Sequence, residues 1–85
     1  MIPAFQDEPP REERLTPYDE RHLVTYLRLL DAHNDGADWQ EAVAIIFEID
    51  PQNEPDRARV VHSSHLERAL WMSNTGYRHL LERRP

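Results

Sequence analysis

The side chains best suited to chemistry in this 85-residue chain lie between Arg57 and Trp71. His62 and His65 stand three residues apart, which on a helix places both imidazoles on one side, as a metal site requires. Glu67 falls on the opposite side and supplies no third ligand, so we predict no metal site and a packed, hydrogen-bonded His65. No acid, base and nucleophile set converges, and cysteine is absent. We therefore predict a protein that is not an enzyme and binds no cofactor.

Two arginines indicate a second kind of chemistry, the recognition of DNA. Arg57 and Arg59 stand at the beginning of a predicted helix, where recognition helices contact base edges. The charge of the chain opposes this interpretation, because residues 29–56 contain eight acidic residues and no basic one, and lysine is absent altogether. A formal net charge of −6 is the reverse of the basic surface that phosphate binding needs. We therefore do not expect the chain alone to bind DNA.

A third candidate is a protein-binding surface on the same predicted helix. Val60, Ser64, Glu67 and Trp71 recur at helical spacing, opposite the side predicted to be buried. Tryptophan is an enriched anchor of protein interfaces, which favours a partner surface. The alternative is that Trp71 covers a neighbouring terminal helix.

The helices that position these residues begin after a polar N-terminal arm. Residues 1–15 contain three prolines and mixed charge, which predicts a disordered or loosely docked arm before a domain at 16–82. Thr16 and Pro17 are typical of a helix start, and Gly36 of the left-handed residue after a helix end. Within this first helix the leucine spacing predicts the buried side, which comprises Leu23, Leu27 and Leu30 with Tyr26 and Leu29 beside it.

Two further helices follow. Asp38 and Glu41 have the spacing of a capping box, which predicts a short helix that ends before Pro51. Pro55 begins a longer helix that we expect to reach about Ser73. The residues predicted to be buried are Ala42, Val43, Ile46 and Phe47 in the short helix, and Ala58, Val61, His65, Ala69 and Met72 in the long one. Tyr77, Leu80 and Leu81 predict a short closing helix.

This order of elements predicts an all-α fold, a small helix-turn-helix-like bundle of three main helices with a short C-terminal helix. The length allows one small domain. The longest apolar run, Ala42 to Phe47, is far shorter than the roughly 20 residues that cross a membrane, and the N-terminus has no signal-peptide pattern. We therefore expect a cytoplasmic protein without a membrane partner.

Several segments resemble a small proteobacterial domain family carried by integrative and conjugative elements. They are Leu15–Asp19 with His22, Tyr26–Ala32, Gly36–Trp39, Ile49–Pro51, Ser64–Leu66, Trp71–Met72 and Gly76–Leu81. The resemblance covers about residues 15–81, and the acidic, stand-alone form is most similar to antiactivators of the QseM type. It implies a helix-turn-helix variant. Some members bind DNA and activate excision of the element, whereas the QseM type binds LuxR/TraR-type quorum-sensing regulators and an excision activator that carries the same domain.

The hypothesis that unites these observations is a non-catalytic transcriptional antiactivator that represses excision and conjugative transfer. Where the family pattern has further basic residues after Arg59, this chain has Val60-Val61-His62, which favours a protein partner. The alternative is a small DNA-binding regulator or excisionase-like factor. The predicted partner-binding residues are Arg57, Val60, Ser64, Glu67, Arg68 and Trp71 on the long helix, and Asp38, Glu41 and Glu48 on or beside the short one.

Overall fold

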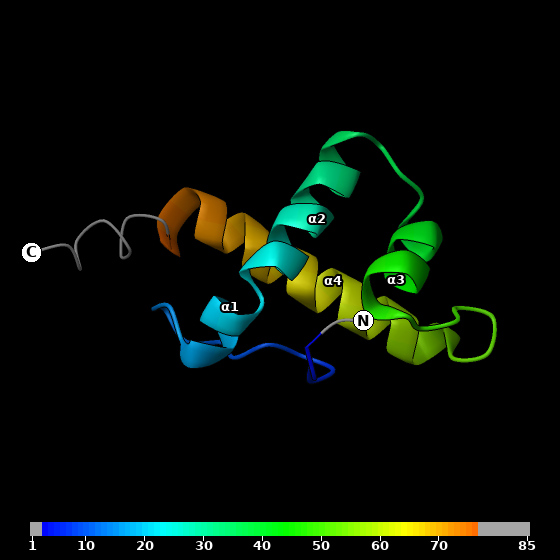
Figure 1. The fold of residues 1–85 in the computed structure, drawn as a ribbon, viewed down its shortest axis with the longest axis horizontal. Helices are drawn as coiled ribbons and strands as arrows, with labels where there is room; N and C mark the ends of the chain where they lie inside the picture. The colour runs from blue at the N-terminus through cyan, green and yellow to red at the C-terminus, as the bar shows by residue number, and fades with distance from the viewer. Residues whose placement is uncertain (1–2, 77–85) are drawn as a thin grey trace, which may run out of the picture.

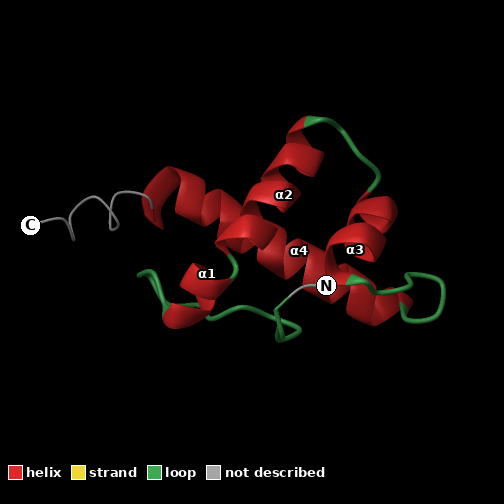
Figure 2. Ribbon diagram, viewed as in Figure 1, coloured by secondary structure: helices red, strands yellow, loops and turns green. Residues whose placement is uncertain are grey.

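The computed structural model describes residues 3–76, and these form a small all-α bundle in which shorter helices and an N-terminal arm pack on one long helix (Figure 1). Figure 2 shows helices and loops only in this part of the chain. The elements in order are α1 (Pro17–Arg21), α2 (Leu23–Asn34), α3 (Trp39–Phe47), α4 (Pro55–Trp71) and a π-helical turn, η1 (Met72–Gly76). The all-α fold class is thereby confirmed. The predicted closing helix at Tyr77, Leu80 and Leu81 lies outside the described residues.

The predicted helix start at Thr16 is confirmed in detail. The Thr16 side chain accepts a hydrogen bond from the backbone N–H of Asp19, and the Asp19 carboxylate accepts one from the backbone N–H of Thr16. This reciprocal pair is a capping box, which satisfies backbone donors that the first helical turn leaves without partners. Pro17 occupies the first turn, where its missing N–H costs nothing.

The prediction of one continuous helix up to Asn34 is wrong, because the chain bends at His22. This residue closes α1 and precedes α2 with a φ of −110° and a ψ of 19°. Its imidazole stacks on the ring of Tyr18 at 4.2 Å and contacts the carbonyl oxygen of Ala4 in the arm. Burial of this ring between α1 and the arm accompanies the break in the helix.

The predicted buried side of α2 is confirmed for Tyr26, Leu29 and the partly buried Leu30, but it is wrong for Leu23 and Leu27. Leu23 and Leu27 are exposed, whereas Tyr26 and Leu29 are almost fully buried. The helix is rotated so that Tyr26 and Leu29, at one edge of the predicted stripe, face the core instead of Leu23 and Leu27. The Tyr26 hydroxyl donates a hydrogen bond to the buried carboxylate of Asp19 at 2.9 Å, which fixes this rotation.

The short and the long helix have the buried residues that their spacing predicts. Ala42, Val43, Ile46 and Phe47 of α3 are buried, and so are Ala58, Val61, His65 and Ala69 of α4, with Met72 partly buried beside them. The expected end at Gly36 is confirmed by a φ of +72°. The Asp38 side chain caps α3, although it accepts from the backbone N–H of Gln40 instead of forming the predicted capping box with Glu41.

The end of α4 differs from the prediction by two residues. The α-helical hydrogen bonds stop at Trp71, and the chain continues as the π-helical turn from Met72 to Gly76. Ser73 and Asn74 donate side-chain hydrogen bonds to the carbonyl oxygen of Leu70. These bonds satisfy a carbonyl group at the helix end, where the helix itself provides fewer partners.

Candidate functional site

The long helix α4 carries most of the candidate residues, and its neighbours decide which of them can meet a partner. The arm lies along one side of α4, α3 lies along another, and the core covers a third (Figure 1). The remaining outer face contains Asp56, Val60, Ser63 and Glu67, all of which are exposed. This open face is the candidate interaction surface.

The arm docks through contacts that include one of the two predicted DNA-reading arginines. Arg57 donates to the carboxylates of Asp7 at 2.9 Å and Glu54 at 3.4 Å, and its guanidinium lies 5.8 Å from the centre of the Phe5 ring. Ser64 donates its hydroxyl proton to the carbonyl oxygen of Asp7. The charge of Arg57 is thus balanced within the molecule. The predicted disorder or loose docking of the arm over residues 1–15 remains a prediction.

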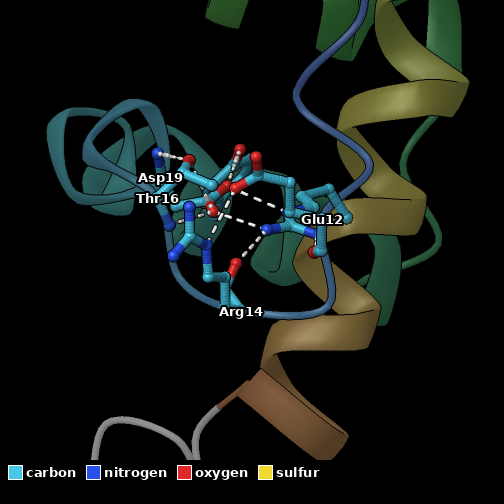
Figure 3. A network of polar contacts seen from close by, with 6 residues as sticks. Glu12, Arg14, Thr16 and Asp19 are labelled. Atoms are coloured by element: carbon cyan, nitrogen blue, oxygen red, sulfur yellow. Dashed lines mark hydrogen bonds and ion pairs between the residues drawn. The ribbon is translucent and has the colours of Figure 1, made fainter.

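Arg68 lies at the centre of a buried polar network that joins the arm, α1, α2 and α4. Figure 3 shows Glu12, Arg14, Thr16 and Asp19 of this network, joined by hydrogen bonds and ion pairs. Its guanidinium donates to both carboxylate oxygens of Asp19, at 3.0 and 2.6 Å. It also donates to the carbonyl oxygens of Glu12 and Arg14 in the arm. The Asp19 carboxylate accepts further hydrogen bonds from Thr16 and Tyr26.

The electrostatics of this network follow from its burial. Burial alone would raise the pKa of Asp19, but the hydrogen bonds from Arg68, Thr16 and Tyr26 outweigh it and hold the pKa below its ordinary value. Asp19 is therefore ionised at neutral pH, and it balances the charge of Arg68. With 8% of its surface exposed, Arg68 has an internal role. Its predicted contact with a partner remains a prediction.

His65 is a core residue with both ring nitrogens occupied. Its Nδ1 lies 2.8 Å from the carbonyl oxygen of Val61, and its Nε2 lies 2.7 Å from the hydroxyl of Tyr18. Since a carbonyl only accepts, Nδ1 carries the proton and Nε2 accepts from Tyr18. Burial lowers the pKa of His65 to about 4. Within the described residues no group of three or more ligands could hold a metal ion.

A shallow groove of about 340 Å³ runs between α3 and α4 beside the open face. Its wall includes Trp39, Arg59, His62 and Leu66. The Arg59 guanidinium lies 5.0 Å from the centre of the Trp39 ring, a cation–π contact that orients it. Among residues 3–76 no carboxylate lies within ion-pair distance of Arg59, so its charge is available to a ligand.

The structure divides the predicted partner line on α4. Val60 is 42% exposed and Glu67 is exposed, so both belong to the open face. Ser64 is half-buried beneath the arm. Trp71 is half-buried, with the Arg68 guanidinium 4.1 Å from its ring centre. Val60 and Glu67 therefore remain the members of this line that a partner reaches directly.

The acidic residues predicted to bind a partner on or beside α3 are all exposed, but they lie apart. Asp38 and Glu41 stand at the beginning of α3, and Glu48 follows its end with a left-handed φ of 58°. The nine residues of α3 are roughly 14 Å long, and this length separates Asp38 and Glu41 at its beginning from Glu48 after its end. A partner that contacts all three must therefore extend along the whole of α3.

Sequence reasoning missed Asp19 and Tyr18 as organising residues. The spacing of Thr16 and Asp19 signals a capping box, which was available from the sequence. The contact with Arg68 joins residues 49 positions apart and has no such local signal.

In the described part of the chain no helix is long and apolar enough to cross a membrane.

Comparison with known proteins gives one informative result. No curated protein matches the sequence. A family model described as "T6SS, Transcription factor, DNA binding domain" matches residues 4–82, which includes the arm from Ala4 onward. The match favours the alternative interpretation, a small DNA-binding regulator, over the main hypothesis of a QseM-type antiactivator, and it does not extend to a conjugative element. Because the match spans nearly the whole sequence, the chain belongs to the RovC DNA-binding domain family.

Proposed function

We propose that the chain acts in transcription regulation by contacting DNA through the open face of α4 together with Arg59 in the groove beside it. The observation that carries this proposal is the state of Arg59. Of the α4 arginines, Arg57 is paired with Asp7 and Arg68 is buried against Asp19, whereas Arg59 is exposed and without a carboxylate partner among the described residues. Family membership supports the same choice.

The neighbours of Arg59 suit the edges of base pairs. An arginine commonly donates two hydrogen bonds to guanine, an aliphatic side chain contacts the methyl group of thymine, and a hydroxyl bonds to several bases. Arg59, Val60 and Ser63 supply these three groups within about one turn of α4. The Trp39 ring holds the guanidinium of Arg59 near the start of the helix, the part that enters the major groove in helix-turn-helix proteins.

The surrounding charge makes this contact weak for an isolated chain. All eight carboxylates between residues 29 and 56 are exposed, and several flank the beginning of α4. Each carboxylate that faces a phosphate opposes the release of counterions that drives binding. We expect sequence preference without high affinity, and a salt dependence that corresponds to only about one to three phosphate contacts, a slope of roughly −1 to −3 in log K against log salt.

The test is selection of duplexes from a pool with a randomised 20-base-pair core at low salt, followed by fluorescence anisotropy of the enriched duplex. Arg59→Ala should weaken binding of that duplex roughly 10-fold or more, the loss of one bidentate base contact. Arg57→Ala removes the same charge from a residue already paired with Asp7 and serves as the matched control with a smaller loss. Failure to enrich any sequence would contradict the proposal.

A second candidate function is the binding of activators as an antiactivator, and the exposed acidic surface favours it. Asp38, Glu41 and Glu48 would meet basic surface that an activator otherwise turns to DNA, and exposed Val60 would add an apolar contact. Such charge complementarity mainly sets association rate and specificity. The proposed partners are LuxR/TraR-type regulators and an activator with the same domain, which would place the chain in the control of excision and transfer of a conjugative element.

A pull-down with a purified TraR-type regulator tests this second function. Val60→Ser together with Trp71→Ala should abolish co-purification while the helical circular dichroism persists. Trp71 contacts Arg68, so Val60→Ser alone is also measured, because its side chain is exposed and distant from the buried network. Retention of the regulator by both variants would refute the assignment of this surface.

A further inference from the structure

The N-terminal arm places a negative charge along one edge of α4. The Asp7 carboxylate accepts a hydrogen bond from Nε of Arg57 at 2.9 Å, and the backbone carbonyl oxygen of Asp7 accepts one from the Ser64 hydroxyl at 3.1 Å. Arg57 and Ser64 are separated by about two helical turns, so they lie on the same side of α4. Asp7 therefore occupies both of these polar side chains at once.

The edge that carries Arg57 borders the open face of α4 on the side opposite to Arg59. At roughly 100° per residue, the open face lies between the directions of these two arginines. Arg59 lies in the groove beside α3, and Arg57 lies beside the arm. A helix in the major groove of DNA has a phosphate backbone on either side of it. When the open face of α4 meets base pairs, Arg57 therefore faces the phosphates of one strand.

The Asp7 carboxylate occupies Arg57 in the way that a phosphate would. Both groups are anions, and a guanidinium donates charge-assisted hydrogen bonds to either of them. The hydrogen bond to Asp7 is the largest influence that raises the pKa of Arg57, whereas Glu54 contacts the guanidinium only at 3.4 Å. The side chains of Arg57 and Asp7 are 41% and 57% exposed. Ion pairs as exposed as this one are weak, so a phosphate can replace the carboxylate.

We propose that Arg57 is a phosphate-binding residue of the DNA contact and that the docked arm blocks it with the carboxylate of Asp7. This inference rests on the proposed contact between α4 and DNA, and it adds a second binding residue and a means of regulation to that contact. The arm is then an autoinhibitory segment, because DNA gains the charge of Arg57 only when Asp7 gives it up. Any event that removes the negative charge of Asp7 from Arg57 strengthens DNA binding.

The carboxylate of Asp7 can be removed while the arm stays docked. The ring of Phe5 packs on Phe47 with their centres 5.1 Å apart, and the backbone N–H of Gln6 donates a hydrogen bond to the Tyr18 hydroxyl at 3.1 Å. Neither contact involves the Asp7 side chain, which is exposed. Asp7→Ala therefore removes the group that competes with a phosphate and leaves the position of the arm unchanged.

The test measures fluorescence anisotropy of an enriched duplex at several salt concentrations, after separate selections with the unmodified chain and with D7A. We expect D7A to bind about 5-fold more tightly and its slope of log K against log salt to steepen by about 0.9, the release of counterions by one further phosphate contact. The double variant D7A/R57A should lose both changes. Asp35→Ala removes the same charge from an exposed residue at the end of α2, so it is the matched control, with an unchanged slope.

The outcomes separate this inference from the proposed function. A gain for D7A that equals the gain for D35A, or that persists in D7A/R57A, would overturn the role of Asp7, while weaker binding by R59A would still support DNA contact through α4. Enrichment of a sequence by D7A alone would support the inference and would contradict DNA binding by the unmodified chain. Failure of both chains to enrich any sequence would overturn both proposals.

Discussion

Replacement of Asp19 by asparagine should be among the most destabilising conservative substitutions in this chain. The carboxylate is fully buried and accepts five hydrogen bonds, two from Arg68, two from Thr16 and one from Tyr26 (Figure 3). Asparagine keeps the shape but turns one acceptor oxygen into a donor NH₂ group, which then faces donors. It also removes the charge that balances Arg68.

The expected loss follows from what remains after the substitution. Breaking a buried ion pair by removing one partner costs about 3–5 kcal/mol. Arg68 keeps its hydrogen bonds to the carbonyl oxygens of Glu12 and Arg14, so the lower end, about 3 kcal/mol, applies here. A chain of 85 residues has a free energy of unfolding of roughly 4–13 kcal/mol, so the loss is a quarter or more of the total.

Urea unfolding followed by far-ultraviolet circular dichroism at pH 7 measures this loss. Asp38→Asn is the matched control, because Asp38 is an exposed carboxylate that caps α3 and asparagine caps a helix about equally well. We expect a change below about 0.5 kcal/mol for this control. A loss of less than about 1 kcal/mol for D19N would refute the view that the buried pair holds the arm, α1 and α4 together.

Three further substitutions or titrations test the remaining parts of the fold. The ring of His65 should titrate near pH 4 by NMR, because burial lowers its pKa in the folded protein. In the unfolded chain this ring has its ordinary pKa of about 6.5, so the unfolded chain binds the proton at a higher pH than the folded one. The free energy of unfolding therefore falls by up to about 1.4 kcal/mol per pH unit as the pH drops from about 6.5 to 4. A titration midpoint near 6.5 would contradict the burial of this ring. Gly36→Ala should lower the free energy of unfolding by about 1 kcal/mol, because a residue with a Cβ is strained at the φ of +72°. The cost stays small because the added Cβ meets no atom within 4 Å. An unchanged stability in thermal or urea unfolding would exclude the left-handed turn. Phe5→Ala should cost about 2 kcal/mol and speed proteolysis of the arm, because the half-buried ring packs on Phe47 at 5.1 Å; equal cleavage rates would show that this contact does not dock the arm.

The helix ends were predictable because the residues that make them act locally. Thr16, Gly36, Asp38 and Pro55 each stand at or next to the boundary that their chemistry predicts. A cap bonds to backbone two or three residues away, and a left-handed glycine terminates its own helix, so no knowledge of distant residues is needed. The buried sides of α3 and α4 were predictable for a similar reason, since each has a clear apolar face.

The rotation of α2 was not predictable from its apolar residues alone. Leucines at helical spacing outnumber the other large residues on this helix, and a simple count places them inside. The structure buries Tyr26, Leu29 and the preceding His22 and leaves Leu23 and Leu27 outside, because polar contacts to Asp19 and to the arm reach Tyr26 and His22 in this rotation. Leu23 and Leu27 are therefore left exposed on the outer side of α2.

The distribution of charge also changes meaning once the fold is known. From the sequence, the arginines after residue 56 form a basic segment beside an acidic one. In the structure Arg57 and Arg68 neutralise carboxylates of the arm and α1, at sequence separations of 50 and 49 residues. Of the three arginines on α4, Arg57 and Arg68 therefore fasten the N-terminal arm to the bundle, and the charge left for a ligand is that of Arg59. If the chain contacts DNA as proposed, with Arg59 as the unpaired positive charge on α4, a bound protein that adds its own contacts would raise the affinity, so the acidic surface of α3 bears on the same question.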